Sequence, residues 1–149
     1  MKILLAIDDS KYSTAAIRAI RAQYPPAQAA VRVLHVVEPL EIPYYPDLAP
    51  PYPASLVDVE KGRIKAGRNV GVRAADQLRK AGFRVTVAVR EGSVRPAIVD
   101  DARKWHADLI VVGSHGRTGV KRMLLGSVSE YVARHAHCSV EIVRMKAGR

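Results

Sequence analysis

A glycine-rich run near the C-terminus, residues 113–129, connects a segment with a strand pattern to a segment with a helical pattern. It follows an apolar stretch, residues 109–112, that is typical of a buried strand, and it leads into residues 127–135, which have a helical pattern. A strand that opens into a glycine loop and ends at a helix N-terminus is a common way to hold phosphate, because glycines allow close approach and free N–H groups attract an anion. The run therefore predicts a nucleotide pocket.

The length and composition fit one domain that spans residues 1–149. A chain of 149 residues with 48% hydrophobic residues is long enough for a sizeable core and is not typical of disorder. No apolar run has the length of a membrane span, and the apolar start of the chain meets Asp8 too soon for a signal peptide. The single cysteine, Cys138, excludes an internal disulfide. We expect a cytoplasmic protein.

The chain is strongly basic, with a net charge of +10 and a pI near 10.1. Many of the basic residues are spread over one long helical segment rather than packed in a block: Arg63, Lys65, Arg68, Arg73, Arg79 and Lys80. The chain has only one Phe and one Trp for stacking on bases. A solvated basic surface is therefore the favoured interpretation, and salt-sensitive, non-specific contact with nucleic acid is the alternative.

The order of apolar segments predicts an α/β fold. Five short segments are predicted as strands: residues 2–7, 30–37, 83–90, 109–112 and 140–143. Helices are predicted between them: one capped by Ser10 or Ser13 and stopped by Pro25, one at 55–81 ended by Gly82, one from Ser93 to about Trp105, and one at 127–135. This alternation predicts a parallel sheet with helices on both faces.

The predicted topology brings two parts of the chain together. Ligands in such sheets bind beyond the carboxyl ends of the strands, where the strand order reverses. A crossover at the third strand places the first and fourth strands side by side, and their ends carry Asp8 and Gly113. Asp8 is thus a candidate for contact with a ribose or a metal, although it can also simply cap the first helix.

A proline-rich segment at about residues 38–54 interrupts this pattern. Its six prolines forbid regular structure: Pro39, Pro43, Pro46, Pro50, Pro51 and Pro53. A surface excursion over one end of the sheet is favoured over a ligand for a proline-recognising domain.

The spacing of the glycines resembles the ATP-binding branch of the universal stress protein family. That motif is a glycine, two residues, a glycine, nine residues, then glycine with Ser or Thr, and here Gly113, Gly116, Gly126 and Ser127 match it completely. Further similarity is found at residues 2–10, 34–37 and 107–116, so it covers essentially the whole domain. Two departures are Asp9, where glycine is frequent, and Ser139, where proline is frequent, and neither removes a phosphate donor.

The resemblance implies a Rossmann-like, doubly wound, five-stranded sheet of order 3-2-1-4-5 that binds ATP. It also implies a homodimer joined through the fifth strand, from Val140 to Val143. Asp8 would lie by the ribose and the phosphates and is the candidate ligand for Mg²⁺ or Mn²⁺. The other implied nucleotide contacts are Ala6 and Val36 at adenine, Val112 and Gly113 at the ribose, Gly116 at the phosphate turn, and Gly126, Ser127, Val128 and Ser129 at the phosphates.

Other polar residues near the loop have two interpretations each. His115 either touches phosphate or faces solvent, and Arg117 and Lys121 either neutralise phosphate or belong to a solvated surface. His35 is interpreted as a core histidine.

The favoured function is an ATP-binding regulatory module of the stress response that acts on an unidentified signalling protein, with little or no hydrolysis. The loop lacks the Gly-Lys-Ser/Thr of a Walker A sequence and has no flanking Gln or Glu to position water. The alternatives are a slow ATPase or a protein that phosphorylates itself at Ser127 or Ser129, and a basic scaffold with nucleic-acid contacts. The preference among ATP, ADP, AMP and cyclic nucleotides stays open.

Overall fold

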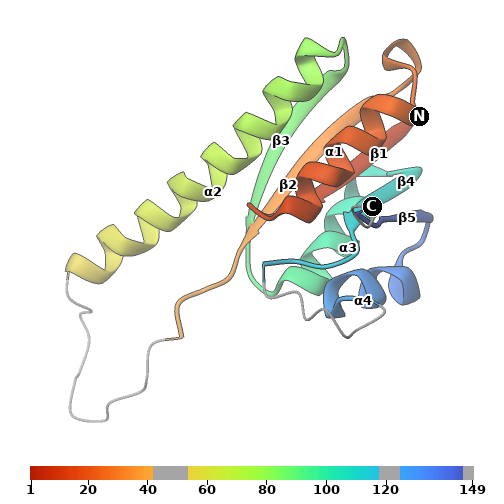
Figure 1. Ribbon diagram of the computed structural model, residues 1–149. Helices are drawn as coiled ribbons and strands as arrows, with labels where there is room; N and C mark the ends of the chain where they lie inside the picture. The colour runs from red at the N-terminus through yellow and green to blue at the C-terminus, as the bar shows by residue number, and fades with distance from the viewer. Residues whose placement is uncertain (42–53, 118–124, 146–149) are drawn as a thin grey trace.

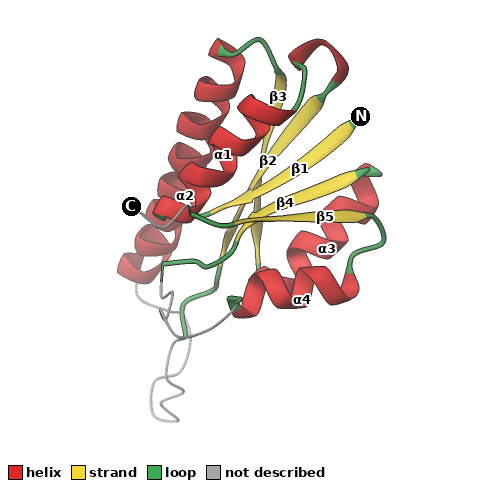
Figure 2. Cartoon of the chain, turned by 45° about the vertical axis from the view of Figure 1, so that its right-hand side comes forward, coloured by secondary structure: helices red, strands yellow, loops and turns green. Residues whose placement is uncertain are grey.

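The computed structural model describes residues 1–41, 54–117 and 125–145. Within them, five parallel strands form one sheet in the order β3-β2-β1-β4-β5. Helices α1 and α2 cover one face of the sheet, and α3 and α4 cover the other (Figures 1 and 2). The predicted α/β fold and strand order are confirmed. Most of the proline-rich segment, residues 42–53, lies outside the described residues, as does Lys121.

The strands have nearly the predicted bounds: β1 (Lys2–Ile7), β2 (Ala30–Val37), β3 (Arg84–Glu91), β4 (Leu109–Gly113) and β5 (Ser139–Val143). Strand β3 begins one residue later than predicted, because the N–H of Phe83 donates to the carbonyl of Leu78 at 3.1 Å and so belongs to the turn that closes α2. Gly82 makes that turn with a φ of +92°, which favours glycine.

The helices are α1 (Lys11–Gln23), α2 (Ala54–Lys80), α3 (Val94–Trp105) and α4 (Ser127–His135), with a short 3-10 turn, η1 (Pro26–Gln28), after α1. Of the two predicted caps of α1, Ser10 is the one that forms, and its side chain accepts from the N–H of Ser13 at 3.3 Å. Ser93 stands at the N-cap of α3, but its side chain makes no capping hydrogen bond. No helix within the described ranges is both long and apolar enough to span a membrane.

Alternation along the central strand divides the core into two clusters. Ile3 and Leu5 of β1 pack toward α1 and α2, whereas Leu4 and Ala6 pack toward α3 and α4. Ile3, Leu4 and Leu5 are fully buried. Because full burial of such a side chain stabilises a fold by about 1.5–3 kcal/mol, the central strand is firmly held and gives the residues at its end a rigid base.

Glycines let α2 lie close to the sheet. A Cβ atom at Gly67 would come within 2.7 Å of Cδ2 of His35, and one at Gly71 within 2.7 Å of Cγ1 of Val87. Glycine within a helix ordinarily lowers its stability. Their contacts show that any larger side chain would push α2 away from β2 and β3.

A buried carboxylate fixes α3 against the sheet. The side chain of Asp101 is only 2% exposed, and it forms ion pairs with Arg90 at 2.6 Å and Arg32 at 3.3 Å. The guanidinium of Arg32 also lies over the ring of Trp105, at 4.9 Å from its centroid. These contacts join β2, β3 and α3, where the sequence alone gave no sign of a buried charge.

The edge strand β5 is tied to α1 through Glu141. The hydroxyl of Tyr24 and the side-chain amide of Gln23 donate to the Glu141 carboxylate at 2.7 Å and 3.1 Å. Burial, the hydrogen bond to Glu141 and its negative charge raise the pKa of Tyr24 to about 12.

Candidate functional site

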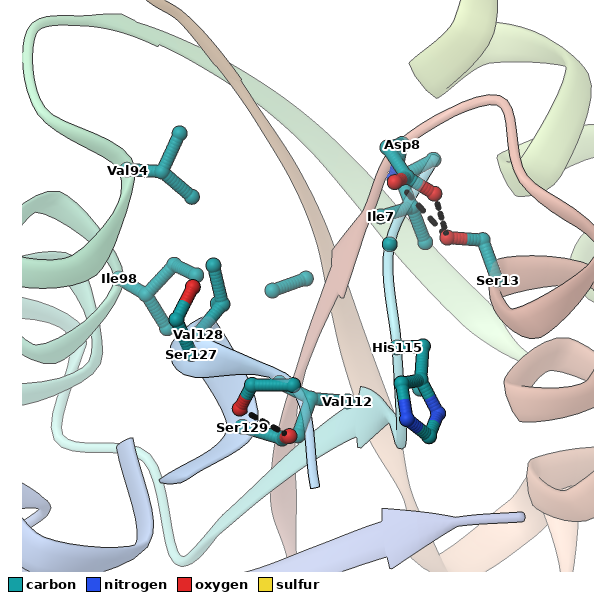
Figure 3. Close-up of a pocket in the computed structure, with 14 residues that line it drawn as sticks. Ile7, Asp8, Ser13, Val94, Ile98, Val112, His115, Ser127, Val128 and Ser129 are labelled. Carbon is teal, nitrogen blue, oxygen red and sulfur yellow. Dashed lines mark hydrogen bonds between the residues drawn. The ribbon is translucent and has the colours of Figure 1, made fainter. Parts of the chain in front are cut away.

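A cavity of about 230 Å³ lies at the carboxyl edge of the sheet, where β1 and β4 run side by side. Its walls come from the end of β1, the start of the glycine loop, and the first turns of α3 and α4 (Figure 3). A second cavity of about 620 Å³ adjoins it and extends over the end of β2 toward α2, and the two share residues such as Asp8 and Ser127. Together they form one cleft at the edge where the topology predicts a ligand.

Asp8 is held in one orientation at the end of β1. Its Oδ1 atom accepts from the Ser13 hydroxyl at 2.7 Å, and its own N–H donates to the same hydroxyl at 2.9 Å (Figure 3). The Oδ1 atom also accepts from the Ser10 N–H at 2.9 Å. Its Oδ2 atom accepts from the N–H of Arg117 at 3.1 Å. Partial burial acts to raise the pKa of the Asp8 carboxyl, but these hydrogen bonds together lower it below its ordinary value. Asp8 is therefore a fixed anion rather than a proton carrier.

The glycine loop is closed by bonds around Ser114. The N–H of Gly126 donates to the Ser114 carbonyl at 2.8 Å. The hydroxyl of Ser129 lies 3.1 Å from the same carbonyl and 2.9 Å from that of Gly126. A hydroxyl has one proton, so the buried Ser129 side chain supports the loop, and its proton is not directed at a phosphate.

At two glycines of the loop, an added Cβ atom would come close to neighbouring atoms. A Cβ atom at Gly116 would lie 3.1 Å from Oδ2 of Asp8, on the floor of the cleft. A Cβ atom at Gly113 would lie 2.7 Å from Cβ of Tyr12 and 3.0 Å from its backbone carbon. Gly113 thus lets α1 dock on β4, which is a structural reason for the residue apart from any phosphate.

The first turn of α4 forms part of the cavity wall. Gly126 is the N-cap, it supplies no side-chain hydrogen bond, and Ser127, Val128 and Ser129 follow along the cavity wall. The first N–H groups of a helix have no partner within the helix, and the helix dipole adds positive potential there. α1 is capped by Ser10, whereas neither α3 nor α4 has a side-chain cap. Of these two helices, α4 directly follows the glycine loop and lines the cavity with three successive residues, so its first turn is the better placed for an anion.

The remaining predicted loop residues lie at the mouth of the cleft. The ring of His115 lines the first cavity, 5.2 Å from the ring of Tyr12, with Nδ1 3.1 Å from the Ser114 hydroxyl. Arg117 lines the second cavity, and its Nε lies 3.4 Å from Oδ1 of Asp9. Both side chains of this pair are more than half exposed, so the pair is screened by solvent.

The structure gathers all twelve predicted contact residues around the cleft. Ala6, Val112 and Gly113 line the first cavity, and Val36 lines the second. His35 is half-buried and borders the second cavity, so the prediction that it is a core residue is wrong. Its Nδ1 atom lies 3.0 Å from the carbonyl of Ile7, so the ring does have a polar partner.

Several cleft residues were not predicted from the sequence. The first cavity is also lined by Ile7, Ser13, Val94 and Ile98. The topology itself gives the missing signal, because in a doubly wound sheet the helices that follow β1 and β3 begin at the same edge as the glycine loop.

The part of the chain that the structure describes offers no complete metal site of its own. Across residues 1–41, 54–117 and 125–145, no group of three or more His, Cys, Asp or Glu side chains could hold a metal ion. Asp8 has three hydrogen bonds to its carboxylate and can offer a cation mainly the remaining capacity of Oδ2. Cys138 lines neither cavity, and burial and the charge of Asp108 raise the pKa of its thiol.

Comparison with known proteins decides the family. The model of the universal stress protein family matches residues 1–144. The chain belongs to the universal stress protein family. It is 31% identical to universal stress protein YxiE of Bacillus subtilis over 145 residues, which cover 96% of this chain and 98% of that protein. It is 46% identical to universal stress protein MJ0531 of Methanocaldococcus jannaschii over 63 residues, a match that spans only 37% of that protein and 42% of this chain.

Solved structures of the family share the whole fold. The structure of hypothetical protein MJ0577 aligns with a TM-score of 0.84 and 27% identity, over 99% of this chain and 97% of that one. A universal stress protein crystallised in complex with cAMP aligns with a TM-score of 0.60 and 25% identity, over 96% of this chain and 95% of that one. The five-stranded sheet of order 3-2-1-4-5 is thus the fold of the family, and one relative holds an adenine nucleotide.

Proposed function

We propose that this universal stress protein binds an adenine nucleotide, ATP in the first place, and acts as a regulatory module. The observation that carries the proposal is the first turn of α4, which has no side-chain cap and lies in the wall of the first cavity. The fixed carboxylate of Asp8 lines the same cavity. A helix N-terminus of this kind favours phosphate. The cAMP complex of a related protein supports the choice of an adenine nucleotide.

The chemistry of the cleft suggests how the nucleotide would lie. Phosphates fit the backbone N–H groups of Ser127 and Val128, beside the turn at Gly116. The base fits the apolar wall formed by Ala6 and Val36, where backbone groups offer the hydrogen bonds. A divalent cation, Mg²⁺ or Mn²⁺, would take most of its ligands from the phosphates and water, with Asp8 as the carboxylate that lines the first cavity.

Slow or absent hydrolysis fits this arrangement. Asp8 is the one carboxylate among the residues that line the first cavity, and hydrogen bonds hold it as an anion with a lowered pKa. A general base needs a pKa near the working pH and a free approach to water. The nucleotide is therefore expected to act through occupancy rather than turnover, although the exposed hydroxyl of Ser127 keeps autophosphorylation as the alternative.

Dimerisation through β5 and a protein partner complete the proposal. β5 is an edge of the sheet, and its outer side has no neighbouring strand within the described chain. An edge strand has unpaired N–H and C=O groups that can bond to a strand of another chain. The signalling partner and the cytoplasmic location are predictions from the sequence alone.

Thermal unfolding with and without Mg²⁺–ATP at physiological salt tests the central proposal. A ligand at 100 times its Kd adds about 2.7 kcal/mol, which raises the Tm by roughly 5–10 °C for a domain of this size. Intact mass after the incubation separates binding from autophosphorylation, and phosphate release separates it from hydrolysis. No rise in Tm, for protein free of co-purified nucleotide, would contradict the proposal.

A further inference from the structure

The positive charge of the chain is concentrated on one face of the folded molecule. Helices α1 and α2, which cover the same face of the sheet (Figure 2), carry ten basic and three acidic residues, a net of +7 out of +10. Helices α3 and α4 carry four basic and three acidic residues, a net of +1. Charges that are spread along the sequence are thus gathered in space.

We define the basic face by the exposed cationic residues of the two helices: Lys11, Arg18, Arg21, Lys61, Lys65, Arg68, Arg73, Arg79 and Lys80. Two of the three acidic residues of α2 are already paired, Glu60 with Arg63 at 3.5 Å and Asp76 with Arg79 at 3.1 Å. Arg63 and Arg79 therefore balance two of the three negative charges of α2 that would repel an anionic partner.

The charges extend in a row along a long, straight element. Lys61, Lys65 and Arg68 follow one another at spacings of four and three residues, so they lie on one side of α2. The 27 residues of α2 span about 40 Å, which is close to the rise of one turn of B-DNA, about 34 Å. The row from Lys61 to Arg68 covers about 10 Å of this length and can reach neighbouring phosphates of one strand. Further cations follow toward the end of α2: Arg73, Arg79 and Lys80.

The basic face has no aromatic side chain for stacking on bases. α2 contains no Phe, Tyr or Trp. Tyr12 of α1 packs against His115, and Tyr24 donates to Glu141. Binding of single strands relies on such aromatic stacking, whereas binding of a duplex backbone relies on Lys and Arg alone.

We propose that the basic face binds the phosphate backbone of double-stranded nucleic acid without sequence preference. An anionic membrane is the less favoured partner, because helices that lie in a membrane surface insert Trp, Phe or Leu, and the exposed large apolar side chains of α2 in the described part of the chain are only Val57, Val59 and Val72. None of the nine residues that define the basic face lines either cavity, so this binding is separate from the nucleotide cleft.

Fluorescence anisotropy with a labelled DNA duplex of about 24 base pairs, titrated between about 50 and 200 mM salt, tests the proposal. The double variant Lys65→Glu/Arg68→Glu is compared with Arg103→Glu/Lys104→Glu, two exposed residues of α3 whose reversal changes the net charge equally. We expect the α2 variant to bind at least about tenfold more weakly, with a log–log salt slope reduced by about two, and the α3 variant to bind like the wild-type protein. Circular dichroism of both variants is the control that checks whether they are folded.

Three results would overturn the proposal. One is the absence of salt-sensitive binding to duplex DNA and to duplex RNA at low salt. Another is an equal loss in both double variants, which would mean that only net charge matters. The third is tighter binding to single-stranded DNA of the same length or to phosphatidylserine vesicles than to the duplex. Because the nucleotide cleft is not involved, Ser127→Asp is expected to leave duplex binding unchanged whether or not the cleft binds ATP.

Discussion

The Oδ2 atom of Asp8 accepts a hydrogen bond of 3.1 Å from the backbone N–H of Arg117, a residue 109 positions later in the chain. This bond joins the end of the first strand to the start of the glycine loop. It also occupies the carboxylate oxygen that a cation bound to phosphate would share. A metal–nucleotide complex that binds at Asp8 would therefore have to share Oδ2 with this N–H.

Asp8→Asn is expected to lower the free energy of unfolding at neutral pH by about 1–3 kcal/mol, because hydrogen bonds to a charged acceptor are lost or weakened. The pKa of Asp8 is lowered in the folded state, so its contribution is fully present above the unfolded pKa and is lost as the pH falls through the folded value. Urea unfolding at a series of pH values should thus show that the difference in free energy of unfolding between the wild-type protein and Asp8→Asn narrows below about pH 4. The neighbouring Asp9→Asn removes only an exposed ion pair and is expected to change stability by less than about 0.5 kcal/mol. A pH-independent loss for Asp8→Asn would contradict the account.

Gly113→Val is expected to destabilise the fold by about 1–3 kcal/mol even in the absence of nucleotide, because the new side chain meets Tyr12. In the double variant Gly113→Val/Tyr12→Gly the combined loss should be smaller than the sum of the single losses, since glycine at position 12 removes the Cβ atom that makes the closest contact. Chemical denaturation of the four proteins measures this coupling. Strict additivity would show that Tyr12 is not what requires a glycine here.

Asp101→Ala is expected to lower stability by about 2 kcal/mol, because it leaves Arg32 partly buried without its carboxylate. The estimate is below that for a fully buried pair, since the side chain of Arg90 is 48% exposed. Asp100→Ala, at the exposed neighbouring position, is the matched control and should have little effect. The fluorescence of Trp105, the single tryptophan, follows unfolding next to Arg32. Equal stability of the two variants would remove the structural role given to Asp101.

Val140→Asp is expected to yield monomers if β5 forms the dimer interface, because paired edge strands would bring two buried charges together. Sedimentation velocity measures the change. Thr86→Asp, an exposed position on the opposite edge strand β3, is the control that should stay dimeric. Dimers of Val140→Asp, or monomeric wild-type protein, would contradict an interface at this edge.

The fold could be predicted from the sequence because its signals are local. Alternating apolar segments, a serine cap at Ser10 and a glycine stop at Gly82 act within a few residues, and each strand lies within one residue of its predicted bounds. The family motif then indicated the cleft, and its twelve predicted residues all border it.

Contacts across the chain could not be predicted in the same way. The bond from Arg117 to Asp8, the burial of Asp101 beside two arginines, and the packing of Gly113 on Tyr12 each depend on which residues the sheet brings together. The same is true of the basic face, because only the pairing of α1 and α2 on one side of the sheet turns scattered charges into a surface.

Isothermal titration calorimetry of ATP with Mg²⁺ into the wild-type protein, Ser127→Asp and Ser127→Asn tests the central claim most directly. Ser127 is exposed in the first turn of α4, where an aspartate is tolerated by the helix dipole but lies where phosphate would bind. We predict saturable binding to the wild-type protein, at least about tenfold weaker binding to Ser127→Asp because of charge repulsion, and near wild-type affinity for Ser127→Asn. Equal affinity of all three proteins, or no binding to nucleotide-free wild-type protein, would contradict the phosphate site at α4.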